Sequence, residues 1–136
     1  MYEKAFQLEI ITPSQVVFRD EATSLTAPGT EGSFQVLFNH APLLSSLEVG
    51  EIKVKDRTGR DLRYATSGGF VEVNDNHVVV LADTAEKVEE IDVERAKSAK
   101  ARAEERLHQK KEHVDEGRAR AALMRAMNRL RLSQRH

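Results

Sequence analysis

The chain has 136 residues, no cysteine and a formal net charge of −1 at pH 7. The lack of cysteine excludes a disulfide framework and a thiolate metal site. No apolar run approaches the ~20 residues of a membrane-spanning helix, and the first ten residues do not resemble a signal peptide.

The charge is unevenly distributed. Residues 1–90 hold 8 Lys/Arg and 15 Asp/Glu, a net of −7, whereas residues 91–136 hold 13 and 7, a net of +6. An acidic body followed by a basic tail indicates an anionic partner for the tail. Nucleic acid, an acidic protein surface and a nucleotide all fit this description.

The first part of the chain predicts short β-strands. Runs such as FQLEIIT, QVVF, SLTAPG, GSFQVL, LEVGEIKVKD, RDLRYATSG, FVEV and HVVVLAD are separated by turn residues between positions 6 and 83. In EIKVKD, Ile52 and Val54 alternate with Lys53 and Lys55, as in a half-buried antiparallel sheet. Because one sheet alone leaves its apolar face in water, these strands predict a small sandwich or barrel.

After Asp83 the apolar period becomes helical. Alanines and leucines recur three and four residues apart, first from Ala96 to Leu107 and again from Ala119 to Leu130. The pattern predicts two helices, about 91–111 and 118–132, joined by a turn at Gly117. Because the apolar stripes are narrow and mostly alanine, we expect the two helices to form a hairpin that is weakly held and able to open.

Charged residues lie beside these stripes. At 100° per residue, Asp92, Arg95, Arg102 and Arg106 fall within an arc of about 80°, and Arg118, Arg125 and Arg129 share one edge of the second helix. Facing each other across the alanines, these edges predict a small basic cleft suited to phosphate oxygens. The alternative is a set of solvated charges on exposed helix faces.

No set of residues predicts catalysis or a metal site. The histidines lack metal-ligand spacing, and neither a Walker motif nor GxGxxG is present. His40 in FNHAPLL is interpreted as a turn or capping histidine. The SGGF segment, residues 67–70, lacks the GxSxG frame, and its two glycines indicate a bulge or a close backbone contact.

Several motifs together resemble the epsilon subunit of the F-type ATP synthase over nearly the whole chain. They are EIITPSQVVF, NHAPLLSSLEVGEIKV, SGGFVEV, VVVLADTAE and IDVERA, in that order. The last fits the I/L-D-x-x-R-A pattern associated with nucleotide binding in bacterial epsilon subunits. The run FQVLFNH departs from the Gly-Ile-Leu-Pro-Gly type of sequence common before the histidine, and the loop QKKEHVDEG is long and charged.

The resemblance implies an α+β chain: an N-terminal, ten-stranded antiparallel β-sandwich in residues 1–86, followed by a C-terminal two-helix hairpin in residues 87–136. It implies a regulatory, non-catalytic subunit of the central stalk. The sandwich would bind the gamma subunit and the ring of c subunits. The hairpin would fold against the sandwich or extend into the catalytic head of alpha and beta subunits, where it inhibits ATP hydrolysis.

The resemblance also implies a regulatory ATP site, with no cofactor required. Its residues would be Glu86, Ile91, Asp92, Arg95, Ala96, Arg102, Arg125 and Arg129. The inhibitory contact would use arginines of the second helix, namely Arg118, Arg120, Arg125, Arg129, Arg131 and Arg135. The chain would lie on the cytoplasmic face of the bacterial plasma membrane, held there only through the complex.

The competing interpretation is a β-domain with a basic helical arm that binds nucleic acid. The charge of the arm fits, but the five Phe and two Tyr all precede residue 71. The arm therefore has no aromatic side chain on which bases could stack, and we expect no nucleic-acid partner.

Overall fold

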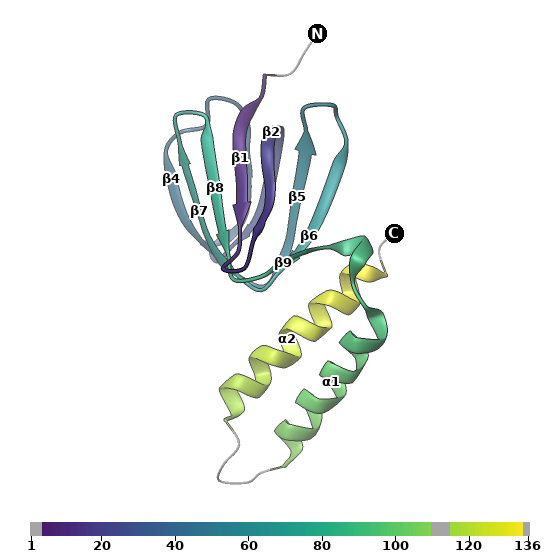
Figure 1. Ribbon diagram of the computed structural model, residues 1–136. Coiled ribbons are helices and arrows are strands. Elements are labelled where there is room, and N and C mark those ends of the chain that lie inside the picture. Colours follow the sequence, from purple (N-terminus) through teal and green to yellow (C-terminus); the bar gives the residue numbers. More distant parts are fainter. Residues whose placement is uncertain (1–3, 110–114, 135–136) are drawn as a thin grey trace. The chain divides into compact units, whose positions relative to one another are not determined.

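The computed structural model describes residues 4–109 and 115–134 (Figure 1). Contacts along the chain divide it into two compact units, Met1–Lys87 and Val88–His136. The sequence prediction places the division one residue earlier, between positions 86 and 87. The first unit is a β-sandwich and the second contains two helices, so the α+β fold class is confirmed.

Nine strands are found in the described part of the first unit. They are β1 (Phe6–Ile11), β2 (Val16–Gly29), β3 (Gly32–Val36), β4 (Leu43–Leu47), β5 (Gly50–Asp56), β6 (Asp61–Thr66), β7 (Gly69–Asn74), β8 (His77–Ala82) and β9 (Ala85–Lys87).

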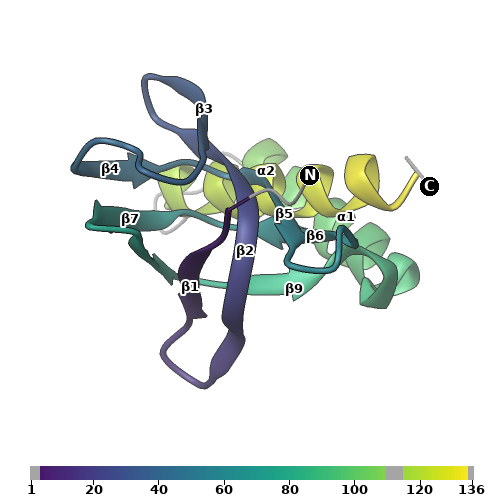
Figure 2. The same cartoon turned by 90° about the horizontal axis from the view of Figure 1, so that it is seen from above.

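The strands form two layers joined by β2, which pairs with β1 of one layer in its first half and with β5 and β3 of the other layer in its second half. The order is β1-β8-β7-β4-β2-β5-β6-β9, with β3 also beside β2 and β1 closing against β2. All pairs are antiparallel except β1 with β8, which is parallel. Figure 2 shows β2 along its length, from its hairpin with β1 to its hairpin with β3. One layer is therefore β1-β8-β7-β4, and the other is β3-β2-β5-β6-β9.

The core of the sandwich lies between these layers. Alternate residues of each strand point inward, as in β5, where Ile52 and Val54 are buried and Lys53 and Lys55 are exposed. Leu8, Ile10 and Leu25 have no exposed surface at all. Burial of large aliphatic side chains from both layers is the main source of stability in such a sandwich.

Three details of the strand prediction need correction. The runs QVVF and SLTAPG belong to one 14-residue strand, β2, because the polar residues between them pair with β1 and β5 rather than forming a turn. The described residues therefore form nine strands where the resemblance implies ten. Strands β4 and β9 were not separately predicted, since LLSSL does not alternate and AEK is only three residues long.

The SGGF interpretation is confirmed. Gly69 has φ of +140°, and a Cβ built there would clash with the carbonyl oxygen of Leu81 on the neighbouring strand. Only glycine permits this close approach between β7 and β8. His40 is likewise a turn residue: its backbone N–H donates to Leu37 O, and its Nδ1 lies 2.7 Å from Ala41 O.

The second unit begins with a short 3-10 turn, η1 (Val88–Glu90), followed by α1 (Val93–His108) and α2 (Glu116–Ser133). The two helices pack along each other, and η1 also contacts α2 (Figure 1). The helical hairpin is confirmed.

The predicted helix ends need correction. Helix α1 begins at Val93, two residues later than expected, because Asp92 caps it. Gly117 is not the turn but lies in the first turn of α2, which is capped by Asp115. The Asp115 carboxylate accepts a hydrogen bond from the Arg118 N–H at 3.0 Å, and such a cap starts a helix more strongly than one glycine stops it. The predicted end of the first helix, at residue 111, lies outside the described residues.

Candidate functional site: an arginine-lined face of the helical hairpin

The two helices meet along a seam of alanines. Ala96 and Ala103 of α1 and Ala119 and Ala126 of α2 are each no more than 3% exposed. Within each pair the spacing is seven residues, close to two helical turns, so both members face the other helix. We call these four residues the alanine seam. Ala99 and Leu107, also predicted for the interface, are only half-buried.

An arginine directly precedes each residue of the seam. The pairs are Arg95–Ala96, Arg102–Ala103, Arg118–Ala119 and Arg125–Ala126. Each arginine therefore lies about 100° from the seam, on the same rotational side of its helix. Because the helices run in opposite directions (Figure 1), these sides fall on one common face of the hairpin.

Arg106 and Arg129 extend the same face. Each stands three residues after a seam alanine, which places it about 60° from the seam on the side of the other arginines. Arg129 is half-buried, whereas Arg106 is exposed. We call Arg95, Arg102, Arg106, Arg118, Arg125 and Arg129 the basic face.

The basic face carries largely uncompensated charge. The side chains of Arg95, Arg102 and Arg125 form no hydrogen bond or ion pair with any described residue. The ion pairs found within the described helices use lysines instead: Lys97 with Glu94 at 3.5 Å and Lys100 with Glu104 at 3.8 Å. These pairs lie on the other sides of α1, so they do not neutralise the basic face.

The aspartates on this face have a structural role. Asp92 Oδ1 accepts a hydrogen bond from the Arg95 N–H at 3.1 Å and caps α1, as Asp115 caps α2. A carboxylate here satisfies an orphan helix N–H and interacts favourably with the positive end of the helix dipole. Asp92 thus anchors the first turn that carries Arg95.

The predicted ATP-site residues fall into two groups. Glu86 lies on β9 of the sandwich, half-buried and opposite Ala65 of β6. The other seven belong to the second unit. Ile91 and Ala96 are buried, and Asp92, Arg95, Arg102, Arg125 and Arg129 lie on the basic face or at its edge.

The predicted inhibitory arginines divide differently. Arg118, Arg125 and Arg129 are on the basic face, but Arg120 and Arg131 point to other sides of α2. Arg131 Nη2 donates to the side-chain oxygen of Asn128 at 2.7 Å. Asn128 and Leu132 are buried although the sequence pattern did not select them. Arg135 lies outside the described residues.

The sandwich has an exposed apolar patch that sequence reasoning missed. Phe70 of β7 and Leu81 of β8 stand directly opposite each other and are 55% and 54% exposed. Leu44 of β4, 73% exposed, lies diagonally across from Phe70, whose direct partner is Ser46. We call Leu44, Phe70 and Leu81 the apolar patch. The signal was available in FVEV and HVVVLAD, where apolar residues occupy both faces of the strands.

The described residues include no group of three His, Cys, Asp or Glu side chains placed to hold a metal ion. Within the same residues, no helix has both the length and the apolarity needed to cross a membrane. The described residues form a sandwich with an exposed apolar patch and a hairpin with a basic face. These features define a binding subunit built from two units.

The comparisons agree with this class. The family model for the ATP synthase delta/epsilon chain β-sandwich domain matches residues 5–88, and the model for the long α-helix domain of the same chains matches residues 89–134. The ATP synthase epsilon chain of Syntrophomonas wolfei is 51% identical over 107 residues, which cover 79% of this chain and 78% of that protein. The epsilon chain of Pelotomaculum thermopropionicum is 50% identical over 110 residues, 81% of each chain.

Solved structures give the same result. A chain in the Euglena gracilis mitochondrial ATP synthase, determined as OSCP/F1/c-ring, matches with a TM-score of 0.80 and 25% identity, over 91% of this chain and 78% of that one. A chain in the central stalk/c-ring of the Tetrahymena thermophila enzyme has the same fold, with a TM-score of 0.56 and 16% identity over 98% and 97% of the two chains. The protein belongs to the ATP synthase delta/epsilon chain family. It is a subunit of the epsilon type and not the catalytic subunit.

Proposed function

We propose that the sandwich links the gamma subunit to the ring of c subunits and that the hairpin is a mobile regulator. In the folded hairpin the basic face binds ATP. In an extended form the same arginines contact the alpha and beta subunits of the catalytic head and inhibit ATP hydrolysis. The chain acts at the cytoplasmic face of the bacterial plasma membrane, through the complex alone, and needs no cofactor.

The observation that carries this proposal is the combination of the alanine seam with the basic face. An alanine buries one methyl group, so the seam holds the helices weakly compared with a leucine interface. Several guanidinium groups on one face repel one another unless an anion lies between them. The folded hairpin is therefore the kind of state that a bound triphosphate stabilises.

ATP acts on this equilibrium through its different affinities for the two forms. A ligand that binds only the folded hairpin stabilises it by about 2.7 kcal/mol at a concentration of 100 times its dissociation constant. That amount is enough to convert a nearly balanced hairpin into a mostly folded one. A deeply packed helical pair would not respond to the same ligand.

Calorimetric titration of ATP into the whole chain tests the nucleotide site. Losing a charge-assisted contact costs about 1.5 to 3 kcal/mol, so Arg95→Ala and Arg129→Ala should each weaken binding by roughly ten- to a hundredfold. Arg120→Ala removes the same charge from another side of α2 and should leave the affinity within about twofold. Unchanged affinity in both basic-face variants would place ATP elsewhere.

Inhibition is tested separately, in a rebuilt ATP synthase. A chain lacking residues 88–136 keeps the whole sandwich core and should still bind gamma, while the complex hydrolyses ATP faster. Replacing Arg125 and Arg129 by Glu should release inhibition more than replacing them by Ala, because repulsion replaces attraction. Both effects should diminish with salt, since the Debye length is about 10 Å at 0.1 M. Equal hydrolysis rates with whole and truncated chains would exclude the hairpin as inhibitor.

We assign the gamma-binding surface to the apolar patch, because apolar side chains on three neighbouring strands offer a contiguous area for a partner. Phe70→Ser with Leu81→Ser should abolish co-purification with gamma. Leu37→Ser is a matched control, since Leu37 is 51% exposed and directly follows β3, which belongs to the other layer. Retained gamma binding by the double variant would move the interface to another face. ATP binding by the isolated chain should be unaffected, which keeps the two proposals separate.

A further inference from the structure

The outer face of the second sandwich layer carries a polar hollow that none of the functions above uses. It has a volume of about 400 Å³ and is lined mainly by side chains of β2, β3, β5 and β6. The side chains that project from this face are Ser24, Thr26, Gln35, Lys53, Lys55, Asp61 and Arg63. A hollow of this size is within the range of ligand-binding sites.

Strand register explains how the hollow forms. Gln35, Thr26, Lys53 and Arg63 are successive cross-strand partners and make one row across β3, β2, β5 and β6. Ser24, Lys55 and Asp61 make a second row, two residues away on the same face. The side chains on β2 are short hydroxyls, while those on either side are long. A trough therefore runs along β2, with walls about 9.5 Å apart at two strand spacings.

The trough is rich in hydrogen-bond donors. Among the described residues, the side chains of Ser24, Thr26 and Gln35 make no hydrogen bond, and the Lys55 ammonium has no ion-pair partner within 4 Å. Lys53 and Arg63 stand directly opposite each other, which is unfavourable for like charges. Glu51 contacts both of them, through an ion pair with Lys53 at 3.6 Å and a hydrogen bond from Arg63 Nε at 2.7 Å.

The spacing of the lysines indicates the shape of the ligand. Lys53 and Lys55 lie two residues apart on one strand, so their side chains emerge about 6.6 to 6.8 Å from each other along β5. An extended peptide running along the trough places its own alternate side chains at the same interval. Carboxylates at alternate positions would match the two ammonium groups, while the hydroxyls of β2 donate from the floor.

We propose that this trough binds an extended acidic segment of a protein partner, with Asp or Glu at alternate positions. The site lies within one layer of the sandwich and involves neither the hairpin nor ATP. Its success or failure is therefore independent of the regulatory proposal. It is also distinct from the apolar patch, which belongs to the other layer.

The test is an amide chemical-shift titration of the whole chain. The probe is acetyl-Glu-Ser-Glu-Ser-Glu-amide, compared with the same peptide carrying Gln for Glu, with acetyl-Glu-Glu-Glu-Ser-Ser-amide and with inorganic phosphate. The alternating acidic peptide should produce saturable shifts at the amides of β2 and β5. The Gln peptide should produce none, and the block peptide and phosphate should bind at least several-fold more weakly.

Matched variants complete the test. Each exposed charge pair is worth a factor of about two to five, so Lys53→Gln with Lys55→Gln should weaken binding about 4- to 25-fold. Arg19→Gln with Arg57→Gln removes two charges elsewhere on the sandwich, where both arginines pair with local carboxylates, and should change it less than twofold. No saturable shift, equal loss in the two double variants, or tighter binding of phosphate or of the block peptide would each overturn the proposal.

Discussion

The sandwich and the hairpin are held together by different amounts of buried surface. In the sandwich, Leu8, Ile10, Leu25 and Ile52 are completely buried, and Tyr64 is 1% exposed. In the second unit the four alanines of the seam are buried, and the larger buried apolar side chains are Val88, Ile91 and Leu132, near the two ends of the unit's chain. Burying a Leu or Ile side chain contributes about 1.5 to 3 kcal/mol, whereas one methyl group contributes about 0.8 kcal/mol. One unit is thus built to stay folded, and the other is built so that a small added free energy decides its state.

The charges follow the same division. In the sandwich the strongest cation contacts are shared with carboxylates, as where Glu51 contacts Lys53 and Arg63. On the basic face of the hairpin, Arg95, Arg102 and Arg125 have no such contact with described residues. A weak apolar seam beside uncompensated charge makes the hairpin sensitive to anions, which the sandwich core is not.

The largest expected effect is in the sandwich core. Leu25→Ala removes a fully buried side chain and should lower the free energy of unfolding by about 2 to 5 kcal/mol. Leu44→Ala makes the same change at a residue that is 73% exposed and should cost less than about 0.5 kcal/mol. Urea unfolding followed by the near-ultraviolet signal of Tyr64 measures both. Similar losses of unfolding free energy in the two variants would mean that Leu25 is not part of the core, contrary to its burial in the structure.

A smaller effect is expected from overfilling the alanine seam. Ala126→Leu should separate the helices at a cost of about 1 to 3 kcal/mol, with loss of helical circular dichroism and no change in the unfolding of the sandwich. Ala121→Leu, at an exposed position of the same helix, is the control and should be nearly neutral. If Ala126→Leu instead raised helicity, the seam could accept a larger side chain. Close packing of its alanines would then not determine the stability of the hairpin.

Removing a helix N-cap should lower helix stability by less than overfilling the alanine seam. Asp115→Ala removes the acceptor for the Arg118 N–H and should destabilise α2 by about 0.5 to 2 kcal/mol, whereas Asp115→Asn should lose only a few tenths. The same pair of substitutions at Asp92 separates capping from ligand binding. Asp92→Asn keeps α1 helical by circular dichroism. If it nevertheless weakens ATP binding, the carboxylate charge contributes to the site, and equal affinity would limit Asp92 to capping.

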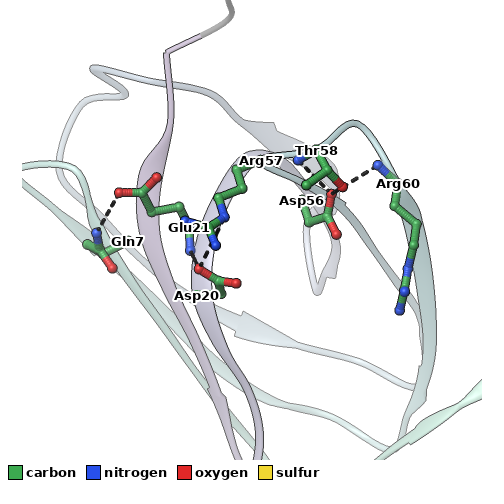
Figure 3. Close-up of polar contacts among 7 residues, drawn as sticks. All are labelled: Gln7, Asp20, Glu21, Asp56, Arg57, Thr58 and Arg60. Carbon is green, nitrogen blue, oxygen red and sulfur yellow. Dashed lines mark hydrogen bonds and ion pairs between the residues drawn. The ribbon is translucent and has the colours of Figure 1, made fainter.

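The smallest effect concerns a turn of the sandwich, between β5 and β6. Figure 3 shows Asp56 accepting from the Thr58 hydroxyl at 2.6 Å and from the Arg60 N–H at 3.0 Å. These hydrogen bonds, that of the Thr58 hydroxyl first, hold the pKa of Asp56 below its ordinary value of 3.8. The contribution of these hydrogen bonds to the stability of the folded sandwich is present above pH 3.8, where Asp56 is ionised. It is lost as the pH falls through the lowered pKa.

Thr58→Ala should therefore raise the pKa of Asp56 toward 3.8, as followed by carboxyl carbon shifts in an NMR titration. Arg57 is the control: it pairs with Asp20 at 3.9 Å, so Arg57→Gln should leave the Asp56 titration in place (Figure 3). An unchanged pKa in Thr58→Ala would assign the shift to the backbone donors instead.

Much of the fold follows from local pattern, and the failures have local causes. Alternation identified β5 and β6, and the change to a three-to-four spacing identified the hairpin. The sequence pattern divides strand β2 in two because RDEAT is polar and resembles a connection, although these residues continue the strand between β1 and β5. The sequence predicts a turn at Gly117 because glycine breaks helices on average, whereas the Asp115 cap decides the local outcome.

The candidate site was predictable only in part. Helical spacing selected the arginines of the basic face, because rotation about one helix is a property of the sequence alone. The common face of α1 and α2 required knowing that Ala96, Ala103, Ala119 and Ala126 form the seam. The polar trough could not be foreseen, since its rows join residues of four strands through a register that single-sequence alternation does not specify.

The central claim, that a weakly held hairpin is stabilised by ATP while the sandwich is indifferent to it, is tested most directly by amide hydrogen exchange of the whole chain with and without ATP. We predict that amides of α1 and α2 exchange through openings that cost much less free energy than those of β5 or β8. ATP should slow exchange in the helices and leave the core strands unchanged. Equal protection of helices and core strands without ATP, or no change in the helices on adding it, would contradict the account.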